Sequence, residues 1–208
     1  MTSPVPAPPR TRAQRSEDSR ARILDAAVAC LVAEGYSGAT TLAIQADADV
    51  SRGGLLHHFP SRDLLLVAAA QHIAAQRVRD TEERVLALVE AGAQGAERID
   101  RVVLALWESY HEAHFWAALE LWTAARSNPG IADALLPEER RLGAVIRASV
   151  ARMMGEPYAS HPRFRQVRDL LLTSMRGAAM TYTFDRRDPA ADPLVGQWQD
   201  LARTLLDA

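Results

Sequence analysis

The segment 40–62 constrains the fold of this chain more than any other, because it has the pattern of two short helices joined by a tight turn. Thr40 or Thr41 can cap the first helix, and Ser51 can accept a backbone N–H at the start of the second. Pro60 ends the second helix. Two such helices that cross steeply form a helix-turn-helix, and the plain alternative is an ordinary helical hairpin.

The residues before this segment indicate a further helix. Over 20–36, Ile23, Ala27 and Leu31 fall on one helical face, and Gly35 stands where a C-terminal cap belongs. We expect this helix to pack over the other two. The apolar residues that would join the three helices are Ile44, Val50, Leu55 and Phe59.

In this order and spacing, the chain resembles the N-terminal domain of the tetracycline-repressor (TetR) family of bacterial transcription regulators. The matching motifs cover about 20–66 and include Glu34-Gly35-Tyr36, Thr40-Thr41, Val50-Ser51-Arg52-Gly53 and the run from His57 to Leu65. The resemblance implies an all-α fold, in which a three-helix DNA-binding domain precedes a larger helical domain that binds an effector and dimerises.

Three positions depart from the family pattern. Gln45, Asp49 and Leu56 stand where the family usually has Ala, Gly and Tyr. Asp49 is compatible with the turn, since Asp tolerates a left-handed conformation better than most residues. Leu56 is the larger departure, because the family's Tyr usually contacts a DNA phosphate.

Several polar residues of the helix-turn-helix are predicted to contact DNA. An arginine near the start of the second helix, Arg52, can pair with guanine, and the two glycines after it would let the backbone approach DNA closely. The adjacent histidines do not indicate a metal site, because neighbours on a helix point about 100° apart. The predicted set is Thr40, Thr41, Ser51, Arg52, Gly53, Gly54, His57, His58 and Arg62.

Positive charge is concentrated near the N-terminus, although the net charge of the whole chain is −2. A basic segment at one end suits phosphate contact at a single surface. We expect a disordered basic arm over 1–18, a DNA-binding domain over 19–62 and a ligand-binding and dimerisation domain over 63–208. The basic residues of the N-terminal segment are Arg10, Arg12, Arg15, Arg20 and Arg22.

The apolar stretches are far shorter than the roughly 20 residues that span a bilayer. The first ten residues are rich in proline and lack the pattern of a secretory signal. We therefore expect a cytoplasmic protein without a membrane segment.

The rest of the chain reads as longer helices with no strand alternation, which predicts an all-α protein. Aromatic residues gather between 107 and 122. Such a cluster is by itself typical of a core, but the resemblance implies a cavity for a small, apolar or aromatic effector in this region. The predicted effector-binding residues are Trp107, Tyr110, His111, Phe115, Trp122 and Met175. His111 and His114 with Glu108 could form a metal face, but we favour a polar pocket or a satisfied pair, and we expect no cofactor.

The last helices have apolar residues at coiled-coil-like spacing, and we predict that they pair with the same helices of a second copy. A two-fold dimer would present two recognition helices about one DNA turn apart, and would read an inverted repeat. The predicted dimerisation residues are Leu172, Ala179, Tyr182, Leu194, Trp198, Leu201 and Leu205, with Met175 in the same repeat.

These patterns favour a homodimeric repressor that a small-molecule effector releases from an inverted-repeat DNA operator. One alternative is a helical-bundle enzyme that uses His111, His114, Glu108 or Glu112 as acid and base on a small apolar substrate. A recognisable nucleophile, phosphate loop or metal set is missing from the sequence, so we expect no enzyme. Another alternative is a DNA-binding protein of the same fold without effector control.

Overall fold

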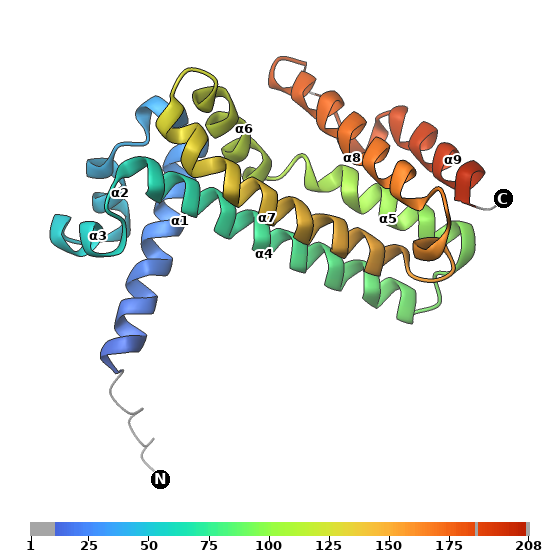
Figure 1. The fold of residues 1–208 in the computed structure, drawn as a ribbon, viewed down its shortest axis with the longest axis horizontal. Helices are drawn as coiled ribbons and strands as arrows, with labels where there is room; N and C mark the ends of the chain where they lie inside the picture. The colour runs from blue at the N-terminus through green and yellow to red at the C-terminus, as the bar shows by residue number, and fades with distance from the viewer. Residues whose placement is uncertain (1–10, 186, 207–208) are drawn as a thin grey trace, which may run out of the picture.

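The computed structural model describes residues 11–185 and 187–206, and over these ranges it contains helices and no strand (Figure 1). The predicted all-α class is therefore confirmed. The α-helices are α1 (Arg12–Gly38), α2 (Thr41–Ala48), α3 (Arg52–His58), α4 (Arg62–Glu90), α5 (Gly95–Ser109), α6 (Ala113–Ala125), α7 (Pro129–Met154), α8 (Phe164–Met180) and α9 (Leu194–Leu206). Short 3-10 turns lie at Tyr158–Ser160, Thr181–Thr183 and Pro189–Ala191.

Helices α1, α2 and α3 form a small N-terminal head with its own core. The side chains of Ile23, Ile44 and Leu55 are completely buried in this core, and Phe59 closes it. Both predicted caps are present: the Thr40 hydroxyl accepts from the Ala43 N–H at 3.2 Å, and the Ser51 hydroxyl accepts from the Gly54 N–H at 3.1 Å. The polar caps and the apolar spacing together fix the helix-turn-helix.

Two predicted turn positions adopt left-handed backbone geometry. Gly35 has φ 66°, which interrupts the helical path near the end of α1, and Asp49 has φ 51° between α2 and α3. Glycine carries no steric penalty there, and Asp is among the few other residues that accept it. The departure of Asp49 from the family pattern is thus accommodated by the turn.

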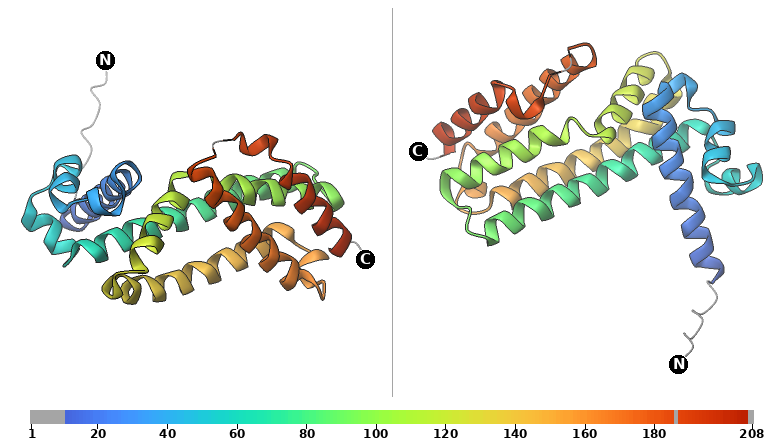
Figure 2. Two further views of the ribbon diagram at one scale, coloured as in Figure 1. Left: turned by 90° about the horizontal axis from the view of Figure 1, so that it is seen from above. Right: turned by 180° about the vertical axis from the view of Figure 1, so that it is seen from behind.

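The N-terminal arm differs from its prediction. Residues 1–10 lie outside the described part of the chain, but 12–18 form the first turns of α1 and are not disordered. A capping box explains the early start, because the Thr11 hydroxyl accepts from the Gln14 N–H at 3.2 Å and the Gln14 side chain accepts from the Thr11 N–H at 2.8 Å. The first turns of α1 extend beyond the head (Figures 1 and 2).

The C-terminal domain is built on two long helices, α4 and α7, that lie side by side (Figures 1 and 2). Helix α5 packs against this pair, and α8 and α9 pack against α5, around a core that includes Trp107, Val150 and Leu171. Among the described residues, no helix is long and apolar enough to cross a membrane.

The head and the C-terminal domain share packing across the boundary predicted at 62. Leu65 and Leu66 at the start of α4 are buried in the core of the head, and so are Ala117 and Leu121 from α6. Leu135 of α7 is buried in the same core, so three helices of the C-terminal domain, α4, α6 and α7, reach into the DNA-binding head.

Candidate DNA-binding face and ligand pocket

Helix α3 presents its polar side to solvent. Leu55 anchors the helix in the core, whereas Arg52, Gly53 and His57 are exposed and Gly54 and His58 are half-buried. Over the described ranges, the Arg52 guanidinium has neither a hydrogen bond nor an ion pair. This free cation near the start of a recognition helix suits the reading of a base edge.

The glycines of α3 are not required by the fold of the head. Neither has a positive φ. A Cβ atom at Gly53 would meet only the Ser51 hydroxyl, at 4.0 Å, and one at Gly54 would meet the same oxygen at 3.4 Å. Since the head has room for side chains there, their absence suits close approach of an outside partner.

Residues of α1 lie beside the end of α3. The Arg20 guanidinium lies 5.4 Å from the centre of the Phe59 ring. Burial lowers the pKa of His58, and the nearby His57 and Arg20 lower it further, so His58 is mainly neutral at pH 7. His58 is therefore a neutral hydrogen-bonding group on this face. Arg20 adds a positive charge beside it, and Arg20 was not among the residues predicted to contact DNA.

Arg62 has a different role from the predicted DNA contact. Its Nε donates to the Ala39 carbonyl at 2.8 Å, and its terminal nitrogen donates to the Tyr36 carbonyl. The guanidinium also lies 4.3 Å from the centre of the Tyr36 ring and 3.6 Å from the Asp63 carboxylate. Arg62 thus links the end of α1 and the start of α2 to α4, and two of its N–H groups are used in backbone hydrogen bonds.

A second link between the domains was not predicted from the sequence. The Glu120 carboxylate of α6 accepts from the Tyr36 N–H at 2.9 Å, directly after the left-handed Gly35. A Cβ at position 35 would approach the same carboxylate oxygen to 2.9 Å, so a side chain there would make the Glu120 carboxylate shift. The partners are 84 residues apart, and no local pattern connects them.

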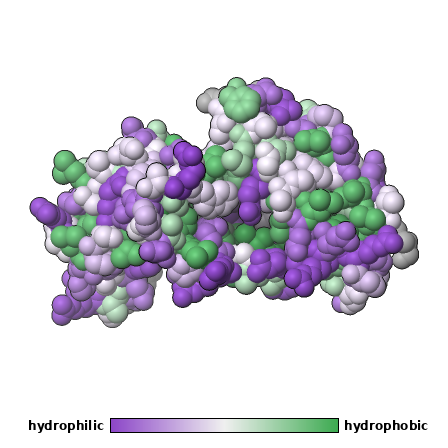
Figure 3. All heavy atoms as spheres, turned by 45° about the horizontal axis from the view of Figure 1, so that its top comes forward, coloured by the Kyte–Doolittle hydropathy of each residue, from purple (hydrophilic) through white to green (hydrophobic). Residues whose placement is uncertain are grey.

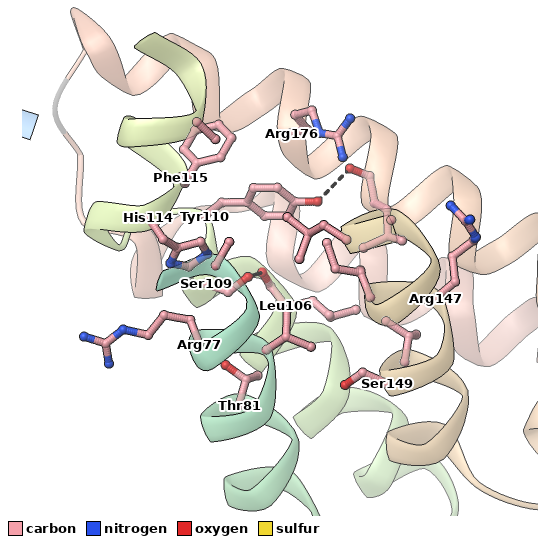
Figure 4. A pocket seen from close by; sticks show the side chains of 18 of the residues that line it. Arg77, Thr81, Leu106, Ser109, Tyr110, His114, Phe115, Arg147, Ser149 and Arg176 are labelled. Carbon is pink, nitrogen blue, oxygen red and sulfur yellow. Dashed lines mark hydrogen bonds between the residues drawn. The ribbon is translucent and has the colours of Figure 1, made fainter. Parts of the chain in front are cut away.

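The C-terminal domain encloses a cavity of about 270 Å³ between α4, α5, α6, α7 and α8 (Figure 4). Three predicted effector residues line it: Tyr110, Phe115 and Trp122. The rings of Tyr110 and Phe115 meet edge to face at 5.2 Å, and the Tyr110 hydroxyl donates to the Leu172 carbonyl at 2.9 Å. The cavity is of a size and character that suit a small, largely apolar molecule.

The other predicted effector residues lie elsewhere. Trp107 and Met175 are fully buried in the packed core, and the Trp107 indole donates to the Pro189 carbonyl at 2.8 Å. His111 lines a separate hollow beside Trp116 and Tyr182. Helical spacing placed all of these residues near one another, but it could not distinguish the cavity wall from the core behind it.

His114 brings a neutral polar group to the cavity. Burial, with a smaller contribution from Arg77, lowers the pKa of His114 to about 4, so the imidazole is uncharged at pH 7. Its Nδ1 is buried without a hydrogen-bond partner among the described residues. Among the described residues of the whole chain, no group of three His, Cys, Asp or Glu side chains could hold a metal ion.

Part of the predicted dimerisation seam faces the core of its own protomer. Ala179, Tyr182 and Trp198 are buried there, and the Tyr182 hydroxyl donates to the buried Asp192 carboxylate. Burial and this hydrogen bond raise the pKa of Tyr182 to about 12. The remaining seam residues, Leu172, Leu194, Leu201 and Leu205, are half-buried.

A different set of apolar residues is exposed near the end of the chain. Leu170, Met180 and Phe184 are 46%, 45% and 80% exposed, respectively. The coiled-coil-like spacing found the buried stripe of α8 because that stripe is the more regular one, and the exposed stripe alternates with polar residues. Leu170 and Met180 lie on the outer side of α8, and Phe184 follows that helix.

A three-helix head with an exposed recognition helix, joined to a helical domain with a cavity, defines a helix-turn-helix regulator. Residues 23–69 match the family described as bacterial regulatory proteins of the tetR family. This N-terminal part of the chain therefore matches the DNA-binding domain of the TetR family of transcription regulators. This family comprises regulators and not enzymes, so the enzyme alternative is set aside.

The known proteins that are similar to this chain match it over different lengths. The transcriptional regulator CymR of Pseudomonas putida is 24% identical over 171 residues, which are 82% of each chain. The transcriptional repressor AcnR of Corynebacterium efficiens is 34% identical over 84 residues, which are 40% of this chain and 45% of AcnR. The crystal structure of the multidrug binding protein EbrR complexed with imidazole has a TM-score of 0.58 at 21% identity, covering 90% of this chain and 94% of EbrR. The last likeness concerns the fold alone.

Proposed function

We propose that the protein is a homodimeric repressor that binds an inverted-repeat operator and is released when a small molecule occupies the α4–α8 cavity. The observation that carries this proposal is the position of the cavity. Its walls include α4, α6 and α7, the three helices that also reach into the core of the DNA-binding head. Because the target is chromosomal DNA, we place the protein in the cytoplasm.

The DNA contact that we propose centres on α3. Arg52 would read a base edge, and the glycines after it would admit the sugar-phosphate backbone. Arg20 would take the phosphate contact in place of Arg62, since Arg20 lies beside the end of α3 and Arg62 is held by two backbone carbonyls and Asp63. The remaining polar residues of the predicted set, including Thr40, Thr41 and Ser51, would surround these contacts.

The dimer that we propose forms through the outer sides of α8 and α9. Leu170, Met180 and Phe184 supply exposed apolar surface. Gly177 in α8 and Gly196 in α9 have open space above them, which would let helices of a second copy approach closely. Figure 3 shows apolar side chains on the surface of the C-terminal domain on this side of the molecule.

The cavity gives a physical route for release. Arg77 and Thr81 of α4 and Phe115 and Trp122 of α6 line it, whereas Leu121 of α6 and the start of α4 are buried in the head. A ligand that fits better with shifted α4 and α6 would change the spacing of the two heads and mismatch them to the operator. A coupling free energy of about 1 to 3 kcal/mol would suffice. The presence of the cavity favours this mechanism over DNA binding without effector control.

A footprint on the DNA immediately upstream of the protein's own coding region tests this function. We expect protection of an inverted repeat, lost at high salt because the contacts include phosphates. The Arg52→Ala variant, at the same concentration, should fail to protect the sites that the native chain protects. Protection that ignores sequence, or that Arg52→Ala leaves unchanged, would contradict the proposed DNA face.

A further inference from the structure

The cavity has an apolar interior and a positively charged rim. Leu106, Ile146, Val150 and Met153 form the interior, together with the rings of Tyr110 and Phe115. Three arginines and one carboxylate reach its lining: Arg77, Arg147, Arg176 and Glu139. Two of these four groups are already neutralised or engaged by neighbours. The Arg77 Nε lies 3.3 Å from the Glu112 carboxylate, and Glu139 accepts a hydrogen bond from Gln71 at 2.7 Å.

The other two arginines have no acidic partner. Within residues 11–185 and 187–206, neither Arg147 of α7 nor Arg176 of α8 forms an ion pair. Figure 4 shows both on the same side of the cavity, with Arg176 beside the Tyr110 hydroxyl. Two uncompensated cations on one side of an apolar cavity attract an anion, and the planar guanidinium matches a carboxylate with two parallel hydrogen bonds.

The aromatic lining could instead suggest a cationic ligand, because ring faces attract cations. One such face is already used. The Arg176 guanidinium lies 5.1 Å from the centre of the Trp122 ring. A cationic ligand at this wall would have to displace Arg176 or lie beside it. Glu139, the one carboxylate among the described lining residues, keeps its negative charge when it accepts from Gln71, but Arg147 and Arg176, which have no ion-pair partner there, outnumber it.

We propose that the effector is an apolar ring compound with a single carboxylate, whose ring lies against Tyr110 and Phe115 and whose carboxylate pairs with Arg176. Arg147 adds a second positive charge on the same side. The inference rests on the proposed function only in taking this cavity as the effector site. It adds the chemical class of the ligand and its orientation.

The experiment compares three probes of one shape on the full chain by calorimetry. They are naphthalene-2-carboxylate, its primary amide and 2-naphthylmethylammonium, which carry charges of about −1, 0 and +1 at pH 7. We expect the carboxylate to bind about tenfold or more tightly than the amide, since a hydrogen bond to a charged group contributes more than a neutral one. The ammonium compound should bind most weakly.

Variants locate the charge that produces this preference. Arg176→Gln should bring the affinity for the carboxylate close to that for the amide, and leave the affinity for the amide unchanged. The matched control is Arg165→Gln, which removes the same charge from an exposed position of α8 away from the cavity lining. Thermal unfolding of both variants verifies that the fold is kept.

The outcomes separate this inference from the proposed function. Equal or tighter binding of the amide or the ammonium probe, a preference that survives Arg176→Gln, or no binding of any probe overturns the inference. An uncharged or cationic compound that binds this cavity and releases the operator would overturn the inference and support the proposed function. Arg176-dependent binding of the carboxylate without any effect on operator affinity would support the ligand class assigned to the cavity, but would overturn effector control and with it the claim that this ligand is the effector.

Discussion

At the scale of single residues, the two arginines of the predicted DNA contact have opposite surroundings. Arg52 is exposed and unpaired among the described residues, whereas Arg62 is half-buried and holds two backbone carbonyls. A side chain with free N–H donors can form hydrogen bonds to DNA. A side chain whose donors bond to the protein backbone instead stabilises the structure that positions the DNA contacts. The two replacements should therefore give different signatures.

Arg52→Ala should lower operator affinity by about 1 to 3 kcal/mol and blur the preference at one base pair of each half-site. Thermal unfolding should not change, because the side chain contacts no core residue. Fluorescence anisotropy with a series of operator variants measures this, and Arg126→Ala in the C-terminal domain is the control. An equal loss on every DNA sequence would mean that Arg52 contacts only phosphate.

Arg62→Ala should destabilise the protein by about 1 to 3 kcal/mol, because it leaves the Tyr36 and Ala39 carbonyls without their donor. Operator affinity should fall as the head loosens, but the slope of log affinity against log salt should stay unchanged. Arg20→Gln should do the reverse, with normal stability and a slope reduced by about one phosphate contact per head. A reduced slope for Arg62→Ala at normal stability would restore Arg62 as a phosphate contact.

At the scale of helices, α6 has two faces with different neighbours. Phe115, Ala118 and Trp122 line the cavity, and Ala117, Leu121 and the Glu120 carboxylate contact the head. A shift of α6 by a ligand therefore reaches α1 through packing and through one hydrogen bond. The hydrogen bond can be removed without changing the cavity wall.

Glu120→Ala should leave ligand affinity within about twofold of the native value, and reduce the effect of the ligand on operator affinity by part of the coupling of about 1 to 3 kcal/mol. Glu120→Gln keeps an oxygen acceptor for the Tyr36 N–H, so it should retain most of the coupling. Operator titrations with and without saturating ligand measure both. A full ligand response in Glu120→Ala would show that packing alone carries the shift.

The helices also show what the sequence could predict. Thr40, Ser51 and Asp49 act within a few residues of themselves, so their roles followed from local chemistry. Arg62 and Glu120 act on partners distant in sequence, and their roles appear only when the helices are packed. In α8, apolar spacing identified Ala179 as part of a contact face, but it could not tell a contact with the same protomer from one with a second copy.

At the scale of the whole molecule, the proposed function depends on two heads held at a fixed separation. Leu170→Arg and Met180→Arg place a charge on the exposed side of α8, where a second copy would have to bury it. We expect monomers in sedimentation experiments, little change in unfolding temperature and a steep loss of operator affinity. Leu136→Arg, at an equally exposed leucine of α7, is the control. Variants that remain dimeric would place the interface elsewhere.

The central claim, that the cavity controls the DNA-binding heads, can be tested without knowing the effector. Ala118→Phe adds a ring to the cavity wall on α6, and Ala144→Phe adds the same ring at an exposed position of α7 that does not line the cavity. The measurement is operator affinity of each dimer at equal folded concentration. We predict that Ala118→Phe weakens operator binding about fivefold or more and that Ala144→Phe does not. Native operator affinity in a folded Ala118→Phe dimer would contradict the account.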